Sequence, residues 1–119
     1  MCVNLVHTAI EQTQKRGVAL SAHGGTYTPS SSLDLAFALF MIVRNARPRA
    51  HEDFFGWSSG DYWLTRDWSW NETAPLYTHP WGEARGPPLF LGEGRFGREY
   101  DGGTFRVDCV RLRANITLR

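Results

Sequence analysis

The chain has 119 residues, enough for one domain with a modest core. Hydrophobic residues make up 42% and charged residues 21%, proportions that exclude a disordered or collagen-like chain. The formal net charge of +1 gives no electrostatic reason to expect nucleic acid or a membrane surface as a partner. No apolar run is long enough to span a bilayer and the first residues lack a signal-peptide pattern, so we expect a soluble protein whose compartment stays open.

The first third of the chain predicts a helix followed by a buried strand. Residues 6–16 carry apolar side chains at helical spacing, and Gly17 is placed as the residue just after the helix. Residues 18–22 form a short apolar run, which is typical of a strand buried on both faces. The strand ends in a loop rich in turn formers, beginning at His23.

A second helix and a second strand follow. The serines at 30–32 are suitable helix N-caps, and residues 35–43 are apolar nearly all round. A helix with no polar stripe must be covered by protein on most sides, which favours a larger barrel over a small free-standing domain. Residues 53–57 then predict another buried strand. Helix, strand, helix and strand with short links are typical of a parallel α/β sheet.

The C-terminal part predicts antiparallel strands. Large side chains alternate with small or charged ones over 96–100 and again over 105–109, and the turn residues Asp101, Gly102 and Gly103 lie between them. This pattern predicts a β-hairpin with one buried face. The alternation continues through 112–118 as a third strand.

The central segment, 58–94, has no periodicity and is rich in Gly, Pro and aromatic residues. Four of the five tryptophans lie within 57–70. A loop this long in a compact domain is usually functional or disordered, and the tryptophans argue against disorder. We therefore divide the chain into a βα portion (1–57), an aromatic-rich functional loop (58–94) and a C-terminal hairpin and strand (95–119).

The two cysteines, Cys2 and Cys109, lie near opposite ends of the chain. They could form one disulfide or remain two unpaired thiols, and sequence does not show whether their Cα atoms come close enough to pair. Unpaired thiols are the commoner outcome and are expected here. No Cys or His spacing indicates a metal site, and no cofactor is predicted.

The predicted site lies beyond the carboxyl ends of the two strands, where parallel α/β folds gather function. Sugar rings present flat C–H faces to aromatic rings, and their hydroxyls need polar partners. An aromatic plug packed on itself is an equally expected use of the tryptophans, and a histidine in a plain tight turn is commoner than a ligand-binding one. The predicted substrate-binding residues are His23, Trp57, Asp61, Tyr62, Trp63, Asp67, Trp68 and Trp70.

Glycoside hydrolysis normally needs two carboxyl groups across the scissile bond. Asp61 and Asp67 are the candidates, because each is embedded among aromatic residues beyond a strand end. Asp67 would equally suit an Asx-turn. Glu52 and Asp53 are expected to be solvated loop charges. The catalytic acid is therefore not assigned.

Several motifs in a fixed order resemble a known family. Residues 35–43, then Phe54-Phe55-Gly56-Trp57-Ser58-Ser59-Gly60, then Asp67-Trp68-Ser69-Trp70 resemble the last part of a TIM-barrel glycoside hydrolase family. Residues 80–88 and 98–108 resemble its closing loop and hairpin. The resemblance implies that 18–22 and 53–57 are the seventh and eighth strands of a (β/α)8 barrel, with a C-terminal antiparallel hairpin or small sheet outside it.

A complete barrel needs roughly 250 residues. The resemblance therefore implies an incomplete domain: a glycosidase fragment that contributes substrate contacts and whose partners are a glycan and the missing front of the barrel. The isolated chain is then expected to hydrolyse no glycoside. The alternatives are a non-catalytic carbohydrate-binding module and a structural domain with a tryptophan-rich core.

Overall fold

A computed structural model describes residues 2–24, 30–46, 53–57 and 79–119. Helix α1 (Cys2–Ile10) continues into a π-helical turn, η1 (Glu11–Lys15), and is followed by strand β1 (Ser21–Gly24). Helix α2 (Ser30–Val43) and strand β2 (Phe54–Trp57) come next. The remaining strands are β3 (Leu89–Gly92), β4 (Arg95–Tyr100), β5 (Gly103–Asp108) and β6 (Arg113–Leu118).

The four C-terminal strands form an antiparallel sheet in the order β3-β4-β5-β6. The hairpin predicted from 96–109 corresponds to β4 and β5, and the third predicted strand corresponds to β6. Strand β3 lies within the segment that the sequence assigns to the aromatic-rich loop. Gly102, in the β4–β5 turn, packs so closely against the backbone of Pro80 and Trp81 that no Cβ fits there. This contact holds the segment before β3 against the sheet.

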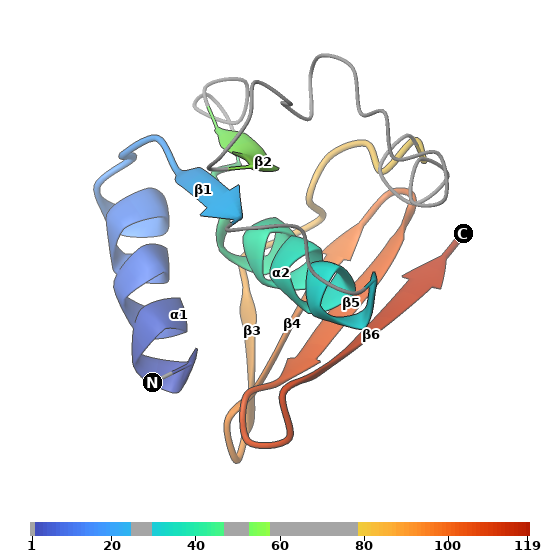
Figure 1. The fold of residues 1–119 in the computed structure, drawn as a ribbon. Coiled ribbons are helices and arrows are strands. Elements are labelled where there is room, and N and C mark those ends of the chain that lie inside the picture. Colours follow the sequence, from blue (N-terminus) through green and yellow to red (C-terminus); the bar gives the residue numbers. More distant parts are fainter. Residues whose placement is uncertain (1, 25–29, 47–52, 58–78) are drawn as a thin grey trace.

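The predicted barrel portion is wrong. Strands β1 and β2 do pair in parallel, but they form a two-stranded sheet of their own. The domain described is a mixed α/β unit with two helices and a four-stranded antiparallel sheet, too small to hold two βα units of a TIM barrel. Figure 1 shows α2 crossing in front of that sheet, with α1 to one side and β1 near the C-terminal end of α2.

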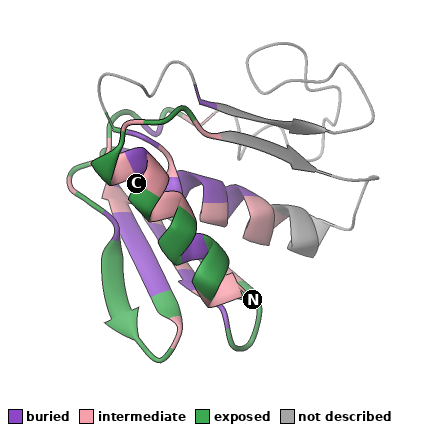
Figure 2. Ribbon diagram, turned by 90° about the vertical axis from the view of Figure 1, so that its left-hand side faces the viewer, coloured by how far each residue is buried: buried purple, intermediate pink, exposed green. Residues whose placement is uncertain are grey.

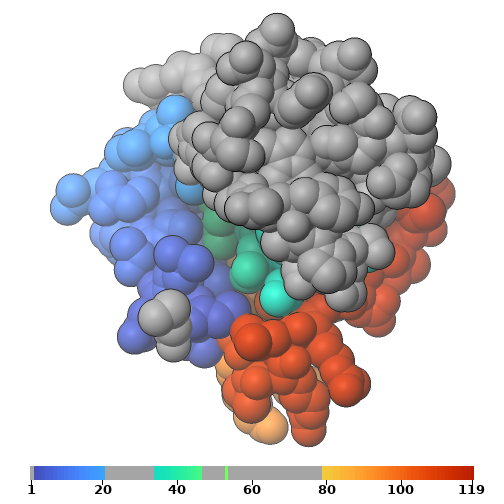
Figure 3. All heavy atoms as spheres, viewed as in Figure 1, coloured from blue at the N-terminus to red at the C-terminus, as the bar shows by residue number. Residues whose placement is uncertain are grey.

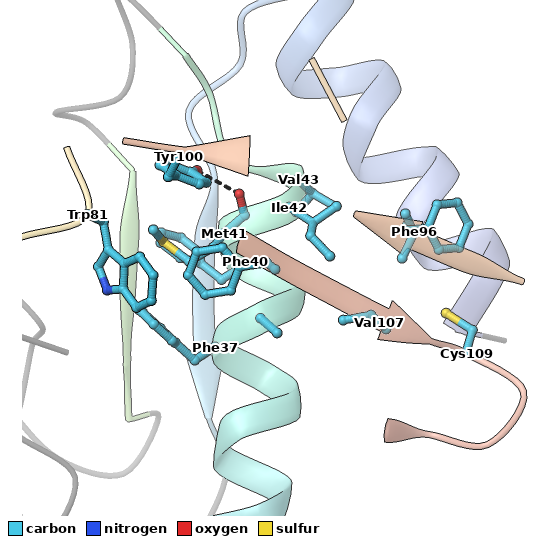
Figure 4. Packing of buried hydrophobic residues seen from close by; sticks show 13 residues of the cluster. Phe37, Phe40, Met41, Ile42, Val43, Trp81, Phe96, Tyr100, Val107 and Cys109 are labelled. Atoms are coloured by element: carbon cyan, nitrogen blue, oxygen red, sulfur yellow. Dashed lines mark hydrogen bonds between the residues drawn. The ribbon is translucent and has the colours of Figure 1, made fainter. Parts of the chain in front are cut away.

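The packing of α2 explains why the barrel prediction fails. Helix α2 contacts β4, β5, β6 and α1, so its apolar surface is covered by elements of this same chain (Figure 2). At the centre, the rings of Phe37 and Phe105 meet in a T-shaped arrangement with their centroids 5.7 Å apart. The centroids of the Phe105 and Trp81 rings are 4.5 Å apart. An all-round apolar helix requires cover, and here an antiparallel sheet supplies it. The buried core, most of which is labelled in Figure 4, consists of Val6, Phe37, Ala38, Phe40, Met41, Ile42, Val43, Trp81, Phe96, Tyr100, Phe105, Val107 and Cys109.

Side chains from β4 satisfy the carbonyl groups at the end of α2. The last four carbonyls of a helix have no partner within the helix. The Tyr100 hydroxyl donates to the Met41 carbonyl at 2.6 Å, as Figure 4 shows. Arg98 Nη1 donates to the carbonyls of Ile42 at 3.1 Å and Arg44 at 2.5 Å. Arg98 and Tyr100, two positions apart on β4, thus cap one helix end.

The π-helical turn after α1 caps the same helix end from the other side. The Thr13 hydroxyl donates to the Val43 carbonyl at 2.6 Å, and Gln14 Nε2 donates to the Arg44 carbonyl at 2.8 Å. Thr13 is buried. Four consecutive carbonyls, 41 to 44, therefore have side-chain donors, and these donors join α1, α2 and the sheet into one unit.

Arg98 is fully buried although it is an arginine. Its Nε donates to the Gly86 carbonyl at 3.1 Å, and its guanidinium lies 5.8 Å from the centroid of the Tyr100 ring. Buried charges are costly unless hydrogen bonds compensate them. Here backbone carbonyls bind Nε and Nη1 and an aromatic face lies nearby, whereas Nη2 is buried without a hydrogen-bond partner among the described residues.

Cys2 and Cys109 form a disulfide, with their Cα atoms 5.4 Å apart although they are 107 positions apart in sequence. The expectation of two unpaired thiols is therefore wrong. The reason is tertiary: α1 packs beside the end of β5, which brings together residues that are distant in sequence. The bond ties the start of α1 to the four-stranded sheet.

We expect the free energy of unfolding to fall when the pH is lowered below the ordinary carboxyl range. Hydrogen bonds from Arg106 and Thr104 lower the pKa of Glu99 from 4.5, and the backbone N–H groups of Glu83 and Arg111 do the same for Asp101 and Asp108, from 3.8. The unfolded state then binds more protons, so this stability is complete above about pH 5 and is lost progressively below it. Denaturant titrations at pH 7 and pH 3 measure the change.

A matched variant, Glu99→Gln, should show a shallower pH dependence, because it removes one of the three titrating groups. Burial raises the pKa of Asp34 from 3.8, which acts in the opposite direction and offsets part of the loss. Equal stability at pH 7 and pH 3 would contradict the prediction.

Candidate functional site

The parallel pairing of β1 and β2 brings two strand ends to one edge. His23 is opposite Gly56 and Gly24 is opposite Trp57 in the strand register. Both strands therefore end at the same level. Residues 25–29 and 58–78, which follow these strands in sequence, lie outside the described part of the chain, and the second range contains most of the predicted sugar-binding residues.

The amino ends of the same two strands are fixed by one buried carboxylate. Asp53 directly precedes β2, and its Oδ1 accepts a hydrogen bond from the backbone N–H of Leu20, directly before β1, at 2.6 Å. The side chain of Asp53 is completely buried. The expectation that Asp53 is a solvated loop charge is wrong, because this carboxylate sets the start of both strands.

Asn45 completes this network from the end of α2. Its backbone N–H donates to Asp53 Oδ2 at 2.7 Å, and its Nδ2 donates both to Asp53 Oδ1 and to the Val18 carbonyl, each at 2.8 Å. Arg44 Nε lies 3.7 Å from Asp53 Oδ2. The carboxylate thus has three hydrogen-bond donors and a nearby cation, which compensates its burial. The strand pair is therefore anchored to the cap of α2, and its carboxyl edge has a defined position.

The structure describes two of the eight predicted substrate-binding residues. The backbones of His23 and Trp57 lie in neighbouring strands, one register step apart. The six others lie outside the described residues: Asp61, Tyr62, Trp63, Asp67, Trp68 and Trp70. Both candidate acids, Asp61 and Asp67, are among these six.

The fifth tryptophan, Trp81, belongs to the core. It is 6% exposed and packs against the rings of Phe37 and Phe105. The His79 and Trp81 rings meet in a T-shaped arrangement with their centroids 4.5 Å apart. His79 Nε2 lies 2.7 Å from the Gly102 carbonyl oxygen. One indole is therefore structural, whereas the side chains of the four tryptophans at 57–70 lie outside the described part of the chain.

A pocket of about 340 Å³ opens beside the end of α2. Its polar side chains include those of Arg44, Asn45, Glu83 and Tyr100. Asn45 and Tyr100 already bind Asp53 and the Met41 carbonyl, so they stabilise the fold. We therefore assign this pocket to the helix cap.

Sequence reasoning missed the residues that position the site, namely Asp53 and Asn45. Their side chains contact backbone atoms more than 25 positions away in sequence, at Leu20 and Val18. No local pattern marks such contacts. The only available signal was an aspartate at the first position of a predicted buried strand.

Within the described ranges, no set of three or more His, Cys, Asp and Glu side chains is placed to hold a metal ion. None of the described helices combines the length and apolar character that crossing a membrane requires. A search of protein-family models and of curated proteins found no match to this chain.

Proposed function

We propose that this chain is a non-catalytic carbohydrate-binding module. Its binding residues are drawn from the shared carboxyl edge of β1 and β2 and from the aromatic-rich segment that follows. The parallel register of the two strands is the observation that supports this proposal most strongly, since His23 is opposite Gly56 and both strands end within one residue of these positions.

The chemistry of the segment suits a sugar. Four indoles and one phenol between 57 and 70 provide flat apolar faces, and Asp61, Asp67 and Asn71 provide hydrogen-bond partners for hydroxyl groups. The anchored strand edge provides a fixed base for such a surface. A preorganised base favours binding because less entropy is lost when the ligand is held.

Binding without hydrolysis is favoured because the described residues form a small mixed α/β unit and not the barrel on which the glycosidase interpretation depended. The motifs that resemble a glycosidase family imply strands and loops of that barrel. No pair of carboxylates at hydrolytic separation is available among the described residues at the β1–β2 edge. A binding role needs neither the barrel nor such a pair.

Titration with a panel of neutral glycans, followed by tryptophan fluorescence, tests the proposal. We expect a saturable change in emission for at least one glycan. Trp63→Ala or Trp68→Ala should weaken affinity by roughly 2- to 10-fold, the effect of losing about 0.5–1.5 kcal/mol of ring stacking. Phe90→Ala is a matched control, because Phe90 is 59% exposed on β3 and belongs to a different sheet.

Two results would contradict the proposal. One is the absence of saturable binding to any neutral glycan while the protein remains folded by denaturant titration. The other is turnover of an aryl glycoside that Asp67→Asn abolishes, which would make the protein an enzyme and not a binding module.

A further inference from the structure

The face of the four-stranded sheet that points away from α2 carries a group of arginines. Strand alternation places Phe96 and Val107 toward the core and the intervening residues outward. In the register, Arg95 is opposite Asp108, and Asp108 is opposite Arg113 on the next strand. Arg95 and Arg113 are thus two strand spacings apart, or about 10 Å between their Cα atoms. We call the outward residues Arg95, Arg106, Arg113 and Asn115 the arginine face.

Two acidic residues share this side of the sheet, and both are already engaged. Glu99 binds Arg106 at 2.6 Å and Arg119 at 2.8 Å. Asp108 accepts hydrogen bonds from the backbone N–H groups of Val110 and Arg111, and its Oδ2 pairs with Arg111 at 3.1 Å. Figure 3 shows the β5–β6 turn, which contains Arg111, protruding from the body of the molecule. The carboxylate of Asp108 is therefore directed to its own turn.

Arg95 and Arg113 consequently lack an acidic partner within the described part of the chain. Arg95 donates to the carbonyls of Leu91 and Gly92, which orient its guanidinium without neutralising its charge. Arg113 is exposed, and no hydrogen bond or ion pair engages it among the described residues. Two positive charges are therefore available on one side of the sheet.

The surface between these arginines is hollowed. Gly97 has no side chain, and the Arg106 side chain lies over it, so that a Cβ at this position would be 2.6 Å from Arg106 Nη1. A groove of about 410 Å³ runs over the strands, and Arg95, Arg106, Asp108, Arg113 and Asn115 contribute to its lining. A ligand that occupies this groove can therefore meet the guanidinium groups of Arg95 and Arg113, which both contribute to its lining.

The chemistry of the face selects an acidic polysaccharide over nucleic acid. Guanidinium groups bind carboxylates and related oxyanions in a bidentate manner, and Asn115 offers a donor and an acceptor for a sugar hydroxyl. Single-stranded nucleic acids are held by basic grooves with aromatic rings for base stacking. The outward positions of β4, β5 and β6 carry no aromatic residue.

We propose that the arginine face binds the acidic groups of an anionic polysaccharide. This second surface is separate from the β1–β2 edge. The choice of a polysaccharide rests on the proposed carbohydrate function, whereas the attraction for an anion rests on the arginines alone.

Calorimetric titration with dextran sulfate, polygalacturonate and neutral dextran tests the proposal on the full chain. We expect one or both acidic polymers to bind with an affinity that falls as salt is raised, and neutral dextran not to compete. The two acidic polymers distinguish sulfate from carboxylate as the recognised group. The double variant R95Q/R113Q should lose at least about ten-fold in affinity, because charge-assisted hydrogen bonds are strong.

The double variant K15Q/R16Q is the matched control. It removes the same net charge from the exposed end of η1 and should bind as the unchanged protein does. Equal loss in both double variants would overturn the proposal, because it would show that only total charge matters. Binding of single-stranded DNA more tightly than either polymer would also overturn it. Trp63→Ala should leave this binding intact, so failure here and failure of the proposed function are distinguishable.

Discussion

Replacement of Arg98 by methionine is expected to lower the free energy of unfolding by about 3 kcal/mol. Methionine retains much of the side-chain volume but removes every hydrogen bond of the guanidinium. The Ile42 carbonyl would be left buried without its donor, which costs about 1–3 kcal/mol, and the part-buried Gly86 carbonyl would also lose its donor. The Arg44 carbonyl would keep Gln14 as its donor, which limits the total. Chemical denaturation of both proteins measures the difference.

The same substitution at Arg106 is the matched control. Arg106 lies one strand away, is partly exposed and pairs with Glu99 on the outward side of the sheet. Exposed ion pairs contribute about 1 kcal/mol or less, so Arg106→Met should be mild. A loss at position 98 no larger than the loss at position 106 would show that the cap of α2 contributes little.

Removal of the disulfide is expected to have the largest effect on stability. A cross-link that closes a loop of about 100 residues restricts the unfolded chain by about 4.7 kcal/mol in the chain-entropy model. The double variant C2A/C109A should therefore lose about 4–5 kcal/mol, and its folding should become insensitive to reductant. Denaturant titration with and without reductant measures both effects.

Reduced unchanged protein is the internal control, because it should unfold at nearly the same denaturant concentration as C2A/C109A. If the oxidised protein and the double variant unfolded together, the cross-link would contribute no net stability. A large difference between the reduced protein and the variant would instead indicate that the alanine side chains disturb the core around Cys109, which is 8% exposed.

The local elements of the fold were predictable because their patterns are local. The alternation over 96–100 and 105–109, with turn residues between, specifies a hairpin without reference to the rest of the chain. The two short apolar runs likewise identified a parallel strand pair, although β1 begins later than the run at 18–22. In each case the side-chain pattern along a short segment directly indicates the backbone conformation of that segment.

The architecture was not predictable because its determinants are contacts over long sequence distances. The all-round apolar surface of a helix such as α2 predicts that the helix is buried. It does not predict which element covers it. Here Tyr100 bonds to the end of α2 across 59 positions. The sequence did not show that α2 and β4 meet, so the barrel prediction used the wrong partner.

The candidate site was predictable only in part. The shared edge of β1 and β2 follows from the strand prediction, and it does bring His23 and Trp57 into neighbouring strands. The burial of Asp53 did not follow, since a charged residue at a strand start usually lies in solvent. Its burial depends on donors from Leu20 and Asn45, which reach it only in the folded chain.

The bond between Cys2 and Cys109 also closes a covalent ring over residues 2–109. One peptide-bond cleavage anywhere between these two positions would open the ring without releasing a piece. On a denaturing gel without thiol, a nicked molecule would therefore migrate as a single species, and its mass would differ from that of the intact protein only by one added water. When thiol is added, it would separate into two fragments. A single cut within residues 2–109 is thus hidden from any assay that leaves sulfur–sulfur bonds intact.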